Sequence, residues 1–287
     1  MLKPFKLISV CNLEEAVSGA ANGLKIFAGG TDILVMMHKG AEYSGLADIS
    51  RIEELKQITF DEKDGLKIGA CVTHSEIISN EFVQKYYPAL VDGCSKIGSV
   101  QVRNKGTIGG NICNASPAAD SAGPLLLYDA TVEIIGKDGR REVPAEEFFT
   151  GVKRTVLKQD ELVVCIKLPR ITEREGSAYL KLMKRGAMEI GIMSSGIRVI
   201  CDENGICRDA RVTLSAVAVT PIRVRSAEEA LKGGKITDES ILQAAEFAYE
   251  TAQPKTWRNS EEWSKDMVKT YIPRTVDLAV ERMKREC

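Results

Sequence analysis

The chain has 287 residues, 44% of them hydrophobic and 28% charged, which is the composition of an ordinary globular protein with room for two domains. Its formal net charge of -1 gives no reason to expect a nucleic acid or an anionic membrane as a partner. No apolar stretch is long enough to span a bilayer and the N-terminal segment has no small-residue cleavage site, so we expect a cytoplasmic protein with no membrane contact.

The first predicted elements are a helix, a strand and a second helix. Asn12 as N-cap and acidic residues in the first turn predict a helix over residues 12–23. The apolar run Ile26-Phe27-Ala28 predicts a short buried strand over residues 25–28, and the apolar run that follows Asp32 reads as the start of a helix. Residues 29–32 must then form the turn between them.

This turn, Gly29-Gly30-Thr31-Asp32, places two adjacent glycines between apolar runs. Without side chains in the way, main-chain N–H groups can converge at such a turn and bind an anion, most often phosphate. A tight turn that binds nothing would need the same residues.

Strands and helices alternate through the next part of the chain, and Asp-Gly pairs mark two hairpins. The expected elements are a strand at 45–50, hairpins at 55–70 and 131–144, helices at 73–79 and 88–97, and a strand at 161–169.

Residues 99–130 are dense in Gly, Asn, Ser and other small residues, which predicts a long functional loop ending in a helix over 118–128. The loop contains a second glycine pair, Gly109-Gly110, beside short polar residues. Two such segments could hold the two halves of a dinucleotide diphosphate with N–H donors. Neither has the spacing of a Rossmann or P-loop motif, so chemistry alone leaves a nucleotide cofactor and two structural turns equally open.

The charged stretch 169–177 is the best candidate for a domain boundary. After it, alternating residues predict a small antiparallel sheet that turns at Asn204-Gly205, and helices follow at 226–233 and 237–252.

The last segment predicts one more helix. Trp263, Met267 and Tyr271 lie at helical spacing, and this stripe reads as core rather than as a cofactor contact. Pro273 is expected to break or kink the helix, or to open a final one.

Metal binding is not indicated. The eight cysteines are scattered, with no Cys-x-x-Cys pair, and they read as buried thiols of a reducing compartment. The two histidines, His38 and His74, are too isolated for a metal cage and read as structural or exposed.

Two motifs together carry a resemblance to a known family. "AGGTD" at 28–32 and "TIGGNICNASPAAD" at 107–120 resemble the flavoprotein subunits of the molybdenum hydroxylases, and the likeness continues in "KLMKRGAMEI", "TPIRV" and "TWRNSEEW". The later segments look most like the separate FAD subunit of bacterial xanthine dehydrogenases.

The resemblance implies an α+β fold. A two-subdomain α/β FAD-binding domain of the PCMH type, similar to vanillyl-alcohol oxidase, would precede a small α+β domain like the C-terminal domain of CO dehydrogenase flavoproteins. The implied boundaries are 1–55 and 56–170 for the two subdomains and 175–287 for the C-terminal domain.

The resemblance also implies cofactor-binding residues on both glycine segments, which would hold the FAD diphosphate from two sides. They are Lys25, Ile26, Phe27, Ala28, Gly29, Gly30, Thr31 and Asp32 in the first segment, and Thr107, Ile108, Gly109, Gly110 and Asn111 in the second.

Asp120 and Lys181 match charged positions near the cofactor in the family. A carboxylate would be repelled by the diphosphate, so Asp120 is expected to accept hydrogen bonds from sugar or ribityl hydroxyls, unless it is only a helix N-terminal charge. Lys181 would favour the anionic reduced flavin, unless it is a solvated lysine.

Two apolar positions complete the set. Leu162 or Val163 falls where the family packs an aliphatic side chain on the cofactor, with a place in a core strand as the alternative. Ile190 falls beside the isoalloxazine, at a position where family members carry an aromatic residue.

No catalytic acid or base stands out, and the family role is electron transfer. Electrons would leave the substrate at a molybdopterin in one partner subunit, cross two [2Fe–2S] clusters in another, reach FAD in this chain and pass to NAD or ferredoxin. The alternatives are the same role in a nicotinate, aldehyde or carbon monoxide dehydrogenase, a free-standing flavin reductase or oxidase, and a cofactor-free nucleotide-binding scaffold.

Overall fold

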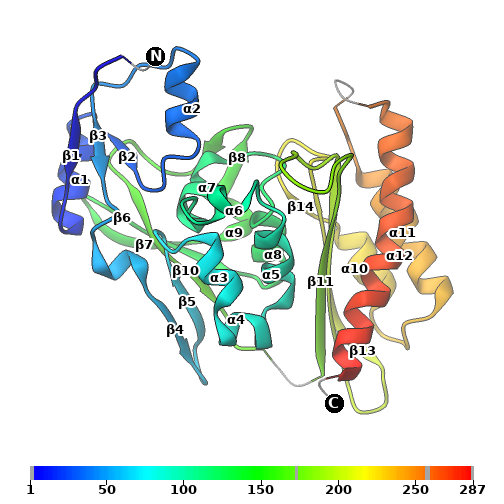
Figure 1. Cartoon of the computed structure of the whole chain (residues 1–287). Coiled ribbons are helices and arrows are strands. Elements are labelled where there is room, and N and C mark those ends of the chain that lie inside the picture. Colours follow the sequence, from blue (N-terminus) through cyan, green and yellow to red (C-terminus); the bar gives the residue numbers. More distant parts are fainter. Residues whose placement is uncertain (1–2, 172–173, 256–258, 286–287) are drawn as a thin grey trace.

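The computed structural model describes residues 3–171, 174–255 and 259–285. Among the described residues, three larger sheets follow one another along the chain, each with its own helices, and a fourth sheet has only two strands (Figure 1). Within these ranges no helix is long and apolar enough to cross a bilayer. The sheets and helices confirm the expected α+β class.

The first sheet is parallel, with its strands in the order β1-β3-β2. Its elements are β1 (Leu7–Ser9), α1 (Leu13–Ala21), β2 (Lys25–Phe27), α2 (Ile33–His38) and β3 (Leu46–Asp48). The predicted helix at 12–23 is confirmed, and the Asn12 side chain caps it by accepting a hydrogen bond from the Glu15 N–H at 2.8 Å.

The second sheet is antiparallel, in the order β4-β5-β10-β6-β7. Its strands are β4 (Ile58–Asp61), β5 (Gly65–Gly69), β6 (Thr131–Gly136), β7 (Gly139–Pro144) and β10 (Leu162–Leu168). Both Asp-Gly hairpins are confirmed, because β4 pairs with β5 and β6 with β7. The elements around this sheet are η1 (Glu53–Lys56), α3 (His74–Ser79), α4 (Glu81–Tyr86), α5 (Pro88–Ser95), α9 (Ala145–Phe148), β8 (Phe149–Gly151) and β9 (Arg154–Thr155).

The long loop expected ahead of residue 118 is wrong, because two short helices occupy much of it, whereas the helix expected over 118–128 is present. The segment forms α6 (Val100–Arg103), α7 (Ile108–Asn114) and α8 (Ala122–Leu127), the last shorter than predicted. Ser99 and Thr107 cap α6 and α7. Glycine and asparagine disfavour helix in isolation, but packing against the second sheet overrides that preference here.

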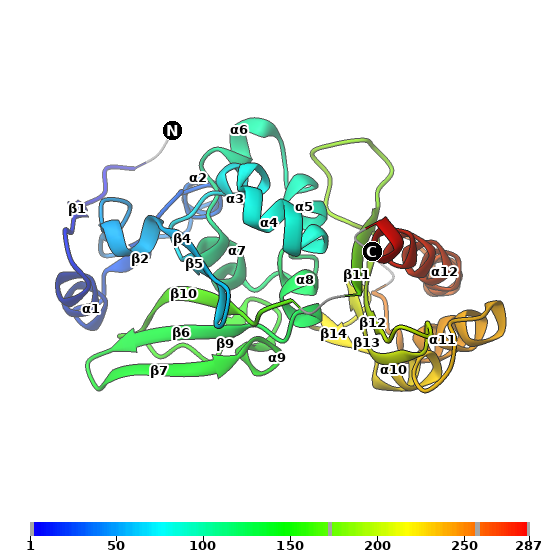
Figure 2. The same ribbon diagram turned by 90° about the horizontal axis from the view of Figure 1, so that it is seen from below.

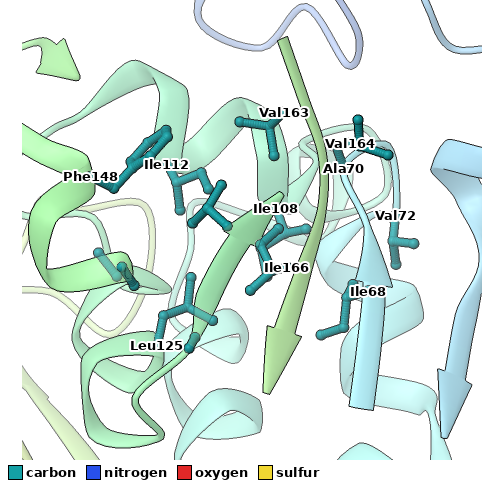
Figure 3. Packing of buried hydrophobic residues seen from close by; sticks show 14 of the residues in the cluster. Ile68, Ala70, Val72, Ile108, Ile112, Leu125, Phe148, Val163, Val164 and Ile166 are labelled. Atoms are coloured by element: carbon teal, nitrogen blue, oxygen red, sulfur yellow. The ribbon is translucent and has the colours of Figure 1, made fainter. Parts of the chain in front are cut away.

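Helix α7 is held by the apolar core of the second sheet. Ile108 of α7 lies next to Ile166 of β10 in Figure 3, and the side chains of Ile108, Ile112 and Ile166 are all fully buried. Burying one such side chain is worth about 2 kcal/mol, so the glycine-rich helix is anchored by its apolar positions.

The third sheet is antiparallel, in the order β11-β12-β13-β14. Its strands are β11 (Glu175–Leu182), β12 (Met193–Cys201), β13 (Cys207–Ser215) and β14 (Ile222–Arg223), followed by α10 (Arg225–Leu231), α11 (Asp238–Thr251) and α12 (Glu261–Arg285). The predicted turn is confirmed, since Gly205 has a φ of 76°. Strand β11 begins inside the segment proposed as a boundary.

This third sheet lies between two helical layers. Helices α10 to α12 cover one face, while α5 and α8 approach from the other, as Figure 2 shows. The sheet therefore joins the C-terminal helices to the part of the molecule that carries the second sheet.

The expectations for the last helix are wrong in part. Pro273 neither breaks α12 nor opens a new helix, because α12 continues through it. Met267 and Tyr271 pack against the C-terminal core as expected, but Trp263 is 38% exposed. Packing of α12 against α11 and the third sheet compensates for the hydrogen bond that proline cannot donate.

Candidate functional site

The two glycine segments meet in space. A methyl group on Gly29 would overlap the main-chain carbonyl of Lys105, and Gly106 lies just beyond it. Gly30 has a φ of 74°, which favours glycine over other residues. The glycine pair is therefore required both by a close approach of two backbones and by the turn itself.

The first glycine segment presents unpaired donors. Within the part of the chain that the structure describes, the main-chain N–H groups of Gly29, Gly30, Thr31 and Asp32 donate no hydrogen bond to protein. Successive N–H groups in a turn form a concave anion site, and leaving them unpaired away from water is costly. This segment fits a diphosphate.

The second segment differs from the expected symmetric arrangement, because its donors are already used. The N–H groups of Ile108 and Gly109 donate to Val72 and Ala70 at 3.0 Å each, and Gly110 donates to the Thr107 hydroxyl at 3.1 Å. The side-chain amide oxygen of Asn111, Oδ1, accepts from the Ser121 hydroxyl at 2.7 Å. This segment contributes polar side chains and a backbone that closely approaches the first segment, rather than main-chain donors.

A cavity of about 840 Å³ opens between the first and second sheets at this meeting point. It is lined by twelve of the residues expected at the cofactor: Lys25, Ile26, Ala28, Gly29, Gly30, Thr31, Asp32, Thr107, Gly109, Gly110, Asn111 and Leu162. Val163 lines it too.

Five of the expected residues do not line the cavity. The Phe27 ring packs against Gly30, and Ile108 is buried in the core behind the second segment. Ile190 is 53% exposed in the loop between β11 and β12. Asp120 and Lys181 form a buried ion pair with each other.

In that pair, Lys181 Nζ lies 2.6 Å from an Asp120 carboxylate oxygen and also donates to the Lys96 carbonyl at 3.1 Å. The Tyr179 hydroxyl lies 3.4 Å from the other carboxylate oxygen. Burial raises the pKa of Asp120 to about 6, although the Lys181 ammonium acts in the opposite direction. Lys181 is therefore not a solvated lysine, and Asp120 is not only a charge at a helix N-terminus.

The segment around Ile97 links this pair to the cavity. Ile97 lines the cavity, its neighbour Lys96 accepts the hydrogen bond from Lys181, and the Gly98 carbonyl accepts one from Met188 at 3.2 Å. The third sheet and its β11–β12 loop therefore adjoin one end of the cavity.

Sequence reasoning missed several lining residues. His74 is one, and Lys153, Arg154 and Thr155 on or beside the β8–β9 hairpin are others. A capping box joins Thr73 and Glu76 at the start of α3, which the pattern Thr-x-x-Glu could have indicated. No pattern marks the hairpin, because it reaches the cavity only through the fold. Among the described residues, no cluster of three or more His, Cys, Asp or Glu could hold a metal ion.

Known proteins resemble the chain along most of its length. Residues 3–171 match the model of the FAD binding domain in molybdopterin dehydrogenase, and residues 178–279 match the CO dehydrogenase flavoprotein C-terminal domain. The chain is 34% identical to the xanthine dehydrogenase FAD-binding subunit of Escherichia coli, over 89% of this chain and 88% of that one. It is 31% identical to the nicotinate dehydrogenase FAD-subunit of Eubacterium barkeri, over 87% of each. A carbon monoxide dehydrogenase chain from Hydrogenophaga pseudoflava superposes with a TM-score of 0.94 at 30% identity, over 98% of this chain and 99% of that one.

Proposed function

The chain belongs to the family of FAD-binding subunits of molybdopterin dehydrogenases, and from this premise we propose that it passes electrons from an iron–sulfur subunit through FAD to NAD. A molybdopterin-binding subunit of the same complex would oxidise the substrate. The chain contributes the flavin site and is an oxidoreductase subunit rather than a complete enzyme.

The observation that carries the flavin site is the row of unpaired N–H groups at Gly29 to Asp32 inside the cavity. They fit the two phosphates, while Thr107 and Asn111 offer polar side chains from the other segment. Ile26, Leu162 and Val163 provide apolar surface for the rings. When bound, FAD supplies the ability to take up electrons singly and release them in pairs.

We place the isoalloxazine at the Ile97 end of the cavity. Lys181 and the loop carrying Ile190 adjoin this end through Lys96 and Gly98. Asp120 holds Lys181 there by the ion pair. The role of Asp120 is then to position a cation beside the ring system, rather than to accept hydrogen bonds from hydroxyl groups.

For the substrate we propose a purine of the xanthine type, supported by the 34% identity to the Escherichia coli subunit. The proposal is tested by native purification with the partner chains and an absorbance spectrum. Xanthine should bleach the flavin band anaerobically, and NAD should restore it. If nicotinate or carbon monoxide bleaches the band and xanthine does not, the complex is of another type. Restoration by ferredoxin alone would contradict NAD as acceptor.

The flavin site itself is tested by Gly29→Ala. Because the added methyl group overlaps the Lys105 carbonyl, the two segments must separate, and FAD affinity should fall roughly 10-fold or more. Gly234→Ala is the matched control, since nothing lies within 4 Å of its added methyl group. Fluorescence titration of apoprotein with FAD measures both. Equal affinity in the two variants would contradict the assigned site.

A further inference from the structure

His74 is fixed beside the second glycine segment. Its side chain is 1% exposed and belongs to the cavity wall. Two main-chain hydrogen bonds hold this part of the chain against that segment: His74 N–H donates to the Gly106 carbonyl at 3.1 Å, and Ile108 N–H donates to the Val72 carbonyl at 3.0 Å. The backbone that carries the imidazole is therefore tied to the second glycine segment.

The His74 ring and the Thr31 hydroxyl both lie close to Gly106. A methyl group on Gly106 would lie 3.5 Å from His74 Cδ2 and 3.4 Å from Thr31 Oγ1. Cδ2 is bonded to Nε2, so this nitrogen is one bond away from the ring atom beside Gly106. Three separate parts of the chain thus bring a ring edge and a hydroxyl to the same glycine, and all three residues line the cavity.

One polar atom of this ring is not satisfied by the protein. Among the described residues, the buried Nδ1 has no hydrogen-bond partner. A neutral imidazole carries one N–H and one lone pair. An unpaired lone pair in the interior costs less than an unpaired N–H, so the proton belongs on Nε2 and the lone pair on the enclosed Nδ1.

The surroundings keep this ring neutral. Burial lowers the pKa of His74 to about 4, and the nearby Arg103 guanidinium acts in the same direction. At neutral pH the ring therefore acts as a single N–H donor.

We propose that His74 binds the FAD diphosphate, by donating a hydrogen bond from Nε2 to a phosphate oxygen held at the first glycine segment beside the Thr31 hydroxyl. The inference rests on the proposed function, because it requires FAD in this cavity. It adds to the main-chain donors a side-chain donor from a third part of the chain.

The test compares two amides at position 74. The amide nitrogen of glutamine can take the place of Nε2, whereas that of asparagine corresponds to Nδ1. His74→Gln should keep FAD affinity within roughly 3-fold of wild type, while His74→Asn and His74→Leu should lose roughly 10- to 100-fold. His38→Leu is the control, because His38 does not line the cavity and its ring contacts the Leu34 carbonyl. Fluorescence titration gives the affinities, and circular dichroism confirms folding.

The outcomes separate the two proposals. Wild-type protein that takes up no FAD would refute the proposed function. Wild-type protein that binds FAD, with His74→Asn and His74→Leu binding equally well, would refute the role of His74. A second readout needs no variant: the ¹⁵N resonances of the His74 ring should shift on addition of FAD. Unchanged resonances in the FAD-bound protein would also refute that role.

Discussion

At the scale of single residues, the buried Asp120–Lys181 pair shows how burial and charge oppose each other. Removing a carboxylate from water favours its protonated form, whereas a cation 2.6 Å away favours the ionised form. Here burial is the larger effect, so the pKa of Asp120 rises to about 6. Lys181 is what allows an ionised Asp120 at neutral pH.

We therefore expect Lys181→Met to destabilise the protein by about 3–5 kcal/mol at pH 8, because an unpaired carboxylate remains buried. The loss should be smaller at pH 5. In the variant the folded-state pKa of Asp120 lies further above that of the unfolded chain. The folded state then binds the extra proton, and the free energy of unfolding falls as the pH rises. Denaturant titrations at both pH values measure this.

Lys3→Met provides the surface control, since Lys3 pairs with Glu42 while its side chain is 82% exposed. Its effect should stay within about 1 kcal/mol at both pH values. A Lys181→Met loss that does not change between pH 5 and pH 8 would contradict the account of Asp120.

The same scale shows what the sequence could predict about the site. Gly29 and Gly30 are recognisable because adjacent glycines between apolar runs indicate a turn in which two backbones approach closely. The ion pair between Asp120 and Lys181 was not predictable from the sequence. It depends on how the third sheet, which carries Lys181, packs against the segment before α8, which carries Asp120. His74 was missed because its place in the cavity wall depends on how the start of α3 packs against the second glycine segment.

At the scale of elements, helix α7 depends on one glycine more than on its neighbour. A methyl group on Gly109 would lie 2.6 Å from the Ala70 carbonyl oxygen, whereas one on Gly110 would meet only the Thr107 hydroxyl at 3.0 Å. Backbone cannot move aside as a side chain can. The helix can therefore approach the chain that follows β5 only if residue 109 has no side chain.

Gly109→Ala should consequently lower the free energy of unfolding by about 1–3 kcal/mol, since α7 must shift away from Ala70. Gly110→Ala should cost less, because alanine favours helix and only a side chain must yield. Thermal unfolding of the two variants checks the order. A larger loss for Gly110→Ala would show that the Thr107 cap matters more than the contact with Ala70.

Some helices and strands could be predicted from their own residues and others could not. The Asp-Gly hairpins were found because turn chemistry and alternation act within a few residues. Helix α7 was missed because its glycines and asparagines disfavour helix locally, and its stability comes from Ile108 and Ile112 in the core. The prediction that Pro273 would break the last helix failed for the same reason, since tertiary packing overrides the local preference of proline against helix.

At the scale of the whole molecule, Asp92 joins three elements. This carboxylate on α5 accepts hydrogen bonds from Arg282 of α12 at 2.6 and 2.9 Å and from the Tyr179 N–H of β11 at 3.0 Å. Arg282 also donates to the Ser177 carbonyl at 2.9 Å. These contacts fix the third sheet against the part of the molecule that forms the cavity.

Arg282→Met should weaken this connection by about 1.5–3 kcal/mol, the range for hydrogen bonds to charged groups. Hydrogen exchange read by mass spectrometry should show lower protection in β11 and unchanged protection in β10. Arg208→Met is the matched control, because the Arg208 side chain pairs with Asp202 at the surface and is 65% exposed. Equal loss of protection in β10 and β11 would mean that the two regions unfold as one unit.

The strand order of the second sheet has a consequence for biosynthesis. Strand β10 lies at its centre, between β5 and β6, yet it is the last of the five to leave the ribosome. Until β10 emerges, β5 and β6 each have one edge without a paired strand. Leu162 and Val163 are also missing from the cavity wall. A nascent chain paused before residue 162 therefore has no finished place to receive its coenzyme, so loading must follow translation of that strand.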